Sequence, residues 1–129
     1  MRNSTYFGAT FGSTINLSNN SALSSSDPDI ATLSKTGQLA VVWSEGVNAS
    51  DTANVDDDDA EDTSKIRYLA SSNSGETFSR SGKVSSNPAS SSAVQPQIAL
   101  SQDRSAYVAW SNGMEDKREI DTFIKIGSK

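Results

Sequence analysis

Short apolar runs, separated by stretches rich in Ser, Asn and Asp, recur along the chain. Two of them, Gln38–Ser44 and Ser105–Ser111, are rich in β-branched and aromatic residues, and each contains a Trp. Lys65–Ala70 and Thr122–Gly127 alternate with a period of two, which is typical of a strand with one buried face. No segment keeps a helical period of 3.6 over three turns. The pattern therefore predicts an all-β protein.

Four shorter segments complete the expected set of strands. Asp29–Leu33 and Gln97–Leu100 each follow a proline, and proline favours extended backbone in the residue before it. Phe11–Ser18 and Phe78–Ser85 are weaker strand candidates. The chain is therefore expected to contain eight strands of about 5–7 residues, separated by turn signals at regular spacing.

The order of these segments repeats along the chain. Phe78 lies 78 − 11 = 67 residues after Phe11, and Trp110 lies the same distance after Trp43. A third match, Pro28-Asp-Ile-Ala31 with Pro96-Gln-Ile-Ala99, is offset by 96 − 28 = 68 residues, which one inserted loop residue explains. Three landmarks in the same order predict two copies of one structural unit. A unit of four short strands fits a propeller blade better than a sandwich.

A turn motif lies between the third and fourth expected strands of the repeat. Ser71-Ser-Asn-Ser-Gly-Glu-Thr-Phe78 matches the pattern Ser-x-Asp-x-Gly-x-Thr-Phe, with Asn73 in the place of the Asp. It resembles the Asp-box, the bacterial neuraminidase repeat of sialidase-like β-propellers. Gly75 can supply positive φ without a Cβ clash, and Asn73 can accept hydrogen bonds from nearby backbone. The other residues expected to tie or fill this hairpin are Ser71, Thr77 and Phe78.

The resemblance covers nearly the whole chain, because the Pro-x-Ile-Ala run and the strand ending in Trp also recur in such blades. Residues 4–11 are a degraded box, with Tyr6 where the Asp belongs. The resemblance implies that residues 1–129 form a single β-propeller segment with blade strands over 9–18, 28–85 and 96–128. It implies two four-stranded blades, circularly permuted, within a six-bladed ring. In the family the box lies on the rim, so it implies a fold and not a chemistry.

This strand order leaves an open edge at both ends of the chain, which proteins avoid. In one interpretation, copies assemble head to tail, and the first strand of one copy completes the last blade of the next. A trimer would then supply six blades. In the other interpretation, the remaining blades belong to a longer parent chain. The sequence leaves both open.

Composition narrows the classes of function. A net charge of −5 disfavours nucleic acids and anionic membrane surfaces as partners. The chain has no His and no Cys, so the commonest general base and thiolate ligands are missing. The N-terminus lacks the apolar region of a signal peptide. Four Asn-x-Ser/Thr sequons give slight support to an extracellular parent protein, and the location is otherwise unknown; they start at Asn3, Asn16, Asn19 and Asn48.

Sialidase chemistry finds little support in these residues. It would need three arginines around a carboxylate and a Tyr nucleophile, and the Arg-Ile-Pro motif of the family is missing. Arg67 lies in a third strand, and Tyr68 and Tyr107 lie within strand patterns. We therefore predict no catalytic residues and a non-catalytic module that is structural or binds glycans or proteins. The alternative is a truncated fragment of a sialidase-like glycoside hydrolase.

The resemblance places ligands at the loops that follow the second and fourth strands of each blade. Indole rings stack on sugars, so Trp43 and Trp110 are candidate glycan-binding residues, with Glu45 and Asn112 as neighbouring hydrogen-bonding groups. A Trp at one place in every blade is more often packing between blades. The sequence leaves both the glycan-binding and the packing interpretation of the two Trp residues open.

An acidic loop is the single candidate metal site. Carboxylate oxygens suit Ca²⁺, but the spacing lacks the alternation and central Gly of an EF-hand loop. A solvated loop is the more common role of such a charge block. No other cofactor is expected. The candidate ligands are Asp56, Asp57, Asp58 and Asp59.

Overall fold

The structure is a computed structural model that describes residues 1–2, 4, 8–46, 64–85, 91–114 and 117–127, with the backbone alone for 114 and 117–127. The described residues form strands, turns and irregular segments, without a helix. The all-β prediction is therefore confirmed. The strands are β1 (Ser24–Leu33), β2 (Gln38–Gly46), β3 (Lys65–Ser71), β4 (Gly82–Lys83), β5 (Ser92–Leu100), β6 (Ser105–Met114) and β7 (Lys117–Gly127).

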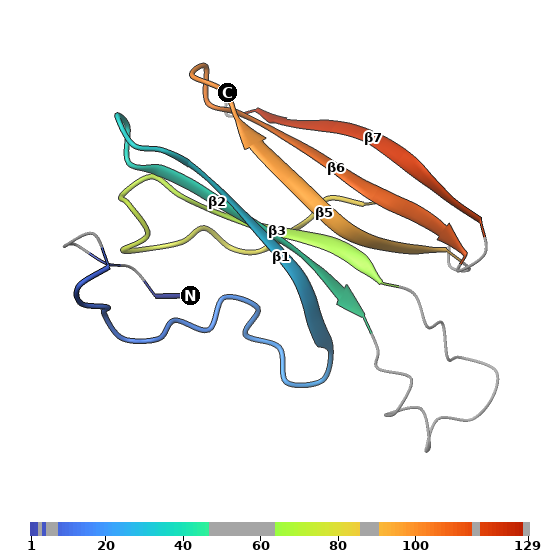
Figure 1. Cartoon of the computed structure of the whole chain (residues 1–129), viewed down its shortest axis with the longest axis horizontal. Helices are drawn as coiled ribbons and strands as arrows, with labels where there is room; N and C mark the ends of the chain where they lie inside the picture. Colours follow the sequence, from blue (N-terminus) through green and yellow to red (C-terminus); the bar gives the residue numbers. More distant parts are fainter. Residues whose placement is uncertain (3, 5–7, 47–63, 86–90, 115–116, 128–129) are drawn as a thin grey trace.

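The strands form two antiparallel sheets that lie against each other (Figure 1). The first sheet has the order β1-β2-β3-β4, and the second has the order β5-β6-β7. In both sheets the second strand, β2 or β6, contains the repeated Trp, and we call it the central strand of its repeat. Every neighbouring pair of strands is antiparallel. Each repeat thus begins with the same three-stranded meander.

Some strands differ from the sequence-based expectation. Residues 9–18 contain no strand. The fourth position of the first sheet is taken by β4, which has two residues where the sequence predicts a strand over 78–85. Among the described residues, 9–18 pair with no strand, although β7 at the edge of the second sheet has a strand on one side only. They lie instead in an irregular N-terminal segment, residues 1–18, in which Ile15 N donates to Met1 O at 2.9 Å.

The first strand of each repeat contains the same β-bulge. The residue before its proline, Asp27 in β1 and Gln95 in β5, has positive φ (50° and 54°). The pairing register shifts at this place in both sheets. The expected extended backbone before proline is therefore replaced by a left-handed residue, and the strand continues toward its N-terminus beyond the bulge. A shared irregularity at matching positions shows that the two halves repeat in structure as well as in sequence.

Each sheet has two distinct faces, which we name from the repeat. The front face carries the Trp of the central strand, so Val41 and Trp43 lie on the front of the first sheet. Val108 and Trp110 lie on the front of the second. The back face is the opposite one, and it carries Val42 in the first sheet because successive strand residues point to opposite sides.

The front of the second sheet packs on the back of the first, and this contact is the main core. Val42 and Ile66 from the first sheet are fully buried against Val108 and Trp110 from the second. Asp29 adds a polar link between the sheets, because its Oδ2 accepts a hydrogen bond from Ile98 N at 2.8 Å. The two repeats therefore meet through different faces.

A second, smaller cluster covers the front of the first sheet. It contains Val41, Trp43 and Leu69, and the N-terminal segment supplies Met1 and Leu17 to it. The first sheet is thus covered on its back by a whole sheet and on its front by a short irregular segment. Equivalent faces of the two repeats have unequal covers.

Candidate functional site

The Asp-box-like motif forms a tight turn between β3 and β4, held by side-chain hydrogen bonds. Asn73 Oδ1 accepts from Thr77 N at 3.0 Å and from Ser71 Oγ at 2.9 Å. Ser71 Oγ in turn accepts from Gly75 N at 2.9 Å. Gly75 has φ 86°, and Phe78 packs into the second cluster. These contacts lie within the turn and between the turn and the second cluster.

Asn73→Ala is expected to destabilise the fold by about 1–2 kcal/mol, because it leaves Thr77 N and the hydroxyl of Ser71 without their acceptor. Asn73→Asp, which restores the motif's usual residue, keeps that acceptor and should stay within about 0.5 kcal/mol of the parent chain. Ser72→Ala, at an exposed neighbour, is the matched control. Urea unfolding measures all three, and equal losses for Asn73→Ala and Ser72→Ala would contradict this role.

The candidate glycan-binding residues are not brought together. Trp43 and Glu45 lie on the front of the first sheet, whereas Trp110 packs from the second sheet onto the back of the first. Both Trp residues lie within their strands and are buried, with 4% and 7% of their surface exposed. Asn112 Oδ1 accepts a hydrogen bond from Ser91 Oγ at 2.7 Å. These positions favour the packing interpretation of both Trp residues.

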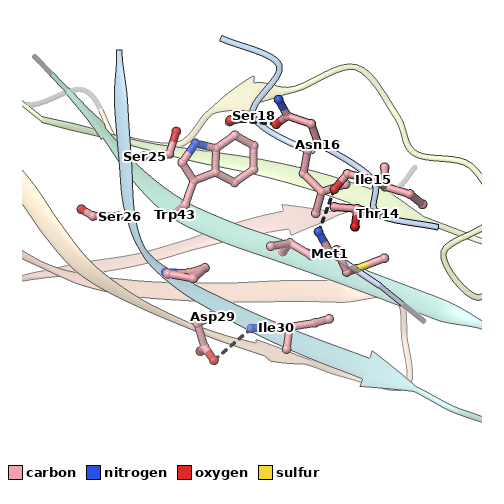
Figure 2. A pocket seen from close by; sticks show the side chains of 13 residues that line it. Met1, Thr14, Ile15, Asn16, Ser18, Ser25, Ser26, Asp29, Ile30 and Trp43 are labelled. Carbon is pink, nitrogen blue, oxygen red and sulfur yellow. Dashed lines mark hydrogen bonds between the residues drawn. The ribbon is translucent and has the colours of Figure 1, made fainter. Parts of the chain in front are cut away.

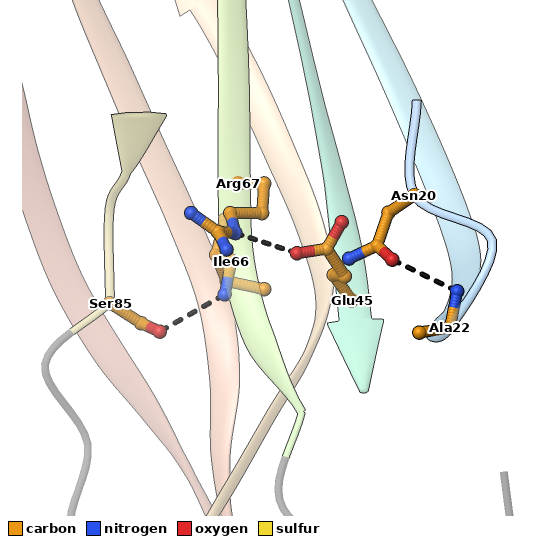
Figure 3. A network of polar contacts seen from close by, with 6 residues as sticks. All are labelled: Asn20, Ala22, Glu45, Ile66, Arg67 and Ser85. Atoms are coloured by element: carbon orange, nitrogen blue, oxygen red, sulfur yellow. Dashed lines mark hydrogen bonds and ion pairs between the residues drawn. The ribbon is translucent and has the colours of Figure 1, made fainter. Parts of the chain in front are cut away.

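Glu45 is held by an ion pair and not offered to a ligand. Its Oε2 lies 2.7 Å from Nε of Arg67 on the neighbouring strand, and its side chain is 4% exposed, against 33% for Arg67 (Figure 3). At the preceding residue of β3, Ile66 N donates a hydrogen bond to Ser85 Oγ at 3.0 Å, which joins the segment after β4 to β3. The arginine that a carboxylate-binding site would need therefore already has a carboxylate partner.

The start of β1, the end of β2 and the starts of β3 and β5 lie at one end of the two sheets (Figure 1). Ser24 at the start of β1 pairs with Gly46 at the end of β2. Ala93 N in β5 donates to the carbonyl of Ser64, which directly precedes β3, at 2.8 Å. The acidic candidates Asp56, Asp57, Asp58 and Asp59 lie outside the described residues. The described residues hold no group of three or more potential metal-ligating side chains.

A cavity of about 710 Å³, which no pattern in the sequence indicates, lies on the front of the first sheet. Its walls are the N-terminal segment, β1 and the central strand, with Trp43, Ile30 and Met1 around it (Figure 2). Ile30 is 49% exposed. Trp43 Nε1 is buried without an acceptor among the described residues, and so is Trp110 Nε1. The unpaired indole is thus common to both repeats and does not single out this cavity for a polar ligand.

A scan against protein-family models finds no matching family, and a search of curated proteins finds no match. Within the part of the chain that is described, there is no helix long and apolar enough to cross a membrane.

Proposed function

We propose that this chain is a non-catalytic module of an Asp-box β-propeller, in which each sheet serves as a blade. Its role is structural or the binding of glycans or proteins, and further blades complete it, either from other copies or from a longer parent chain. The observation that carries the proposal is the packing of one repeat's front on the other repeat's back. Blades follow one another in this way around a ring, whereas a sandwich of two equivalent sheets would bring equivalent faces together.

Two features of the side chains support a non-catalytic role. Arg67 is occupied by Glu45, and Tyr68 packs against the main core. The hydrogen bonds around Asn73 hold a turn rather than a substrate site. The second candidate function is a fragment of a sialidase-like glycoside hydrolase, which the motif itself favours but which needs arginines and an acid from outside this chain.

A fluorogenic sialoside assay separates these two functions. We expect no release of fluorophore above the buffer rate from the parent chain, and the same from Arg67→Ala. Turnover by the parent chain that Arg67→Ala abolishes, with both proteins folded by circular dichroism, would contradict the non-catalytic proposal. A glycan array on the same protein then distinguishes a lectin from a scaffold, because a scaffold binds no glycan.

A further inference from the structure

The front of the first sheet is the repeat equivalent of a surface that is already an interface. Ile98, Val108 and Trp110 on the second sheet are buried by the back of the first. Their counterparts in the first repeat are Ile30, Val41 and Trp43. There the cover is the N-terminal segment alone, and it leaves Ile30 half exposed beside an apolar cavity.

The back of the second sheet is the complementary surface, and no sheet of the described residues covers it. Asp29 and Ala31 on the back of the first sheet face the second sheet, whereas their counterparts Gln97 and Ala99 are exposed. Each half of the internal interface thus has a second copy that no sheet of the described residues covers.

We propose that the front of the first sheet is a docking surface for the back of the second sheet of another copy of this chain. This inference rests on the proposed blade-type packing, and it names the partner and the surface. The contact would repeat, between chains, the contact that joins the two sheets within one chain. Such a heterologous contact is directional, because each chain contributes a different face.

The chemistry of the two faces fits this partner. Ile30, Val41 and Trp43 on one side and Ala99 and Gln97 on the other are uncharged, and the charged side chains Glu45 and Arg67 on the front of the first sheet are paired with each other. At these positions docking would bury no unpaired charge, which would be costly. The carboxamide oxygen of Gln97 replaces the carboxylate of Asp29 as a possible acceptor between sheets.

Tyr107 also finds room at this contact. It occupies the position of Ala40 in the repeat and lies on the back of the second sheet, opposite to Val108. A tyrosine ring is much larger than a methyl group and buries about 150–250 Å². The space beside Ile30, which the cavity and the N-terminal segment now occupy, can take this larger ring.

The N-terminal segment must move aside for docking, and its bonds allow this. The hydrogen bonds between Met1 and Ile15, at 2.7 and 2.9 Å, are internal to the segment and can persist when it leaves the sheet. Its hold on the sheet is the contact of Met1 and Leu17 with the second cluster. The N-terminal segment, which we call the placeholder, thus competes with the second copy for the front of the first sheet.

Two complementary variants test the proposal by molar mass in solution. Ile30→Asp removes one docking face and Ala99→Asp removes the other, so each chain alone is expected to be monomeric while the parent chain associates. Mixed together, they retain one intact face of each kind and should form a complex of one chain each that grows no further. Ser34→Asp, which adds the same charge in an exposed turn, should associate like the parent chain.

A third variant tests the placeholder. Leu17→Ser weakens the hold of the segment, and we expect it to associate about tenfold more tightly, a change of about 1.4 kcal/mol. Weaker association of Leu17→Ser than of the parent chain would contradict the claim that the segment leaves the sheet on docking.

The inference is overturned if the parent chain stays monomeric at about 1 mM, which places any Kd above about 1 mM. It is also overturned if the two Asp variants, each folded by circular dichroism, fail to form a complex when mixed. Neither result touches the non-catalytic module, whose blades could come from a longer chain. Sialoside turnover, in contrast, would end the proposed function without deciding the docking surface.

Discussion

Trp110→Ala is expected to destabilise the protein by about 3–5 kcal/mol, the range for removing a buried Trp from a core. The indole is 7% exposed and packs between the two sheets, against residues such as Val42 and Ile66. Its Nε1 has no acceptor among the described residues, so the loss comes from packing and burial and not from a hydrogen bond. Because a domain is stable by only about 5–15 kcal/mol, much of the protein would unfold at moderate temperature.

Trp43→Ala is the matched comparison, and its loss should be smaller by at least about 1 kcal/mol. Trp43 is as buried as Trp110, but its cover is the N-terminal segment, and a cavity lies beside it. A loosely covered site can relax more around a truncated side chain, and the cost of truncation depends on that relaxation. Urea unfolding below the concentration at which the chain associates measures both variants. Equal losses would contradict the unequal covers of the two sheets.

Arg67→Met is expected to destabilise the protein by about 2–3 kcal/mol. It leaves the Glu45 carboxylate, 4% exposed, without its ionic partner. Breaking a buried ion pair costs about 3–5 kcal/mol, and we take a lower value because the Arg67 side chain is 33% exposed to water. Lys35→Met, at an exposed turn, removes the same charge elsewhere and should change stability by less than about 0.5 kcal/mol.

The double variant Glu45→Gln/Arg67→Met distinguishes an ion pair from two independent effects. Removing both charges leaves no buried carboxylate, so its loss should be well below the sum of the two single losses. The coupling is measured from urea unfolding of the four chains at one pH. Additive losses would mean that the 2.7 Å contact contributes little to stability.

The central strands and the turn motif could be predicted from the sequence because their signals are local. The β-branched and aromatic residues of 38–44 and 105–111 favour strands whatever lies around them, and the structure extends both by two or three residues. The turn around Asn73 is specified by residues within eight positions of one another. Its hydrogen bonds need no distant partner to form.

The N-terminal segment could not be predicted, because its conformation depends on what the rest of the chain offers. Residues 9–18 have strand-forming composition, but a strand forms only where it pairs with a neighbouring strand, and these residues lie across the front of the first sheet instead. The sequence predicts these strands from Asp29 and Gln97, whereas β1 and β5 begin at Ser24 and Ser92, and most of the added residues are polar. They pair through backbone bonds that do not require apolar side chains.

The sequence pattern also does not predict which faces of the two sheets pack together. Trp43 and Trp110 occupy identical places in the repeat, so periodicity assigns them the same surroundings. Their covers differ because only one of them has a preceding sheet within the described chain to pack on. The polar link from Asp29 to Ile98 has one signal in the sequence. The Asp of Pro-Asp-Ile-Ala becomes Gln97 in the second repeat, while the Pro and the Ile-Ala around it are kept.

Methyl–aromatic nuclear Overhauser effects in the isotopically labelled monomer test the front-to-back packing most directly. We expect cross-peaks from the Trp110 indole to the methyl groups of Val42 and Ile66, and from the Trp43 indole to Val41 and Leu69. Cross-peaks between the two indole rings, without contacts from Trp110 to Ile66, would show that the two front faces meet. That result would contradict both the blade-type packing and the docking surface built on it.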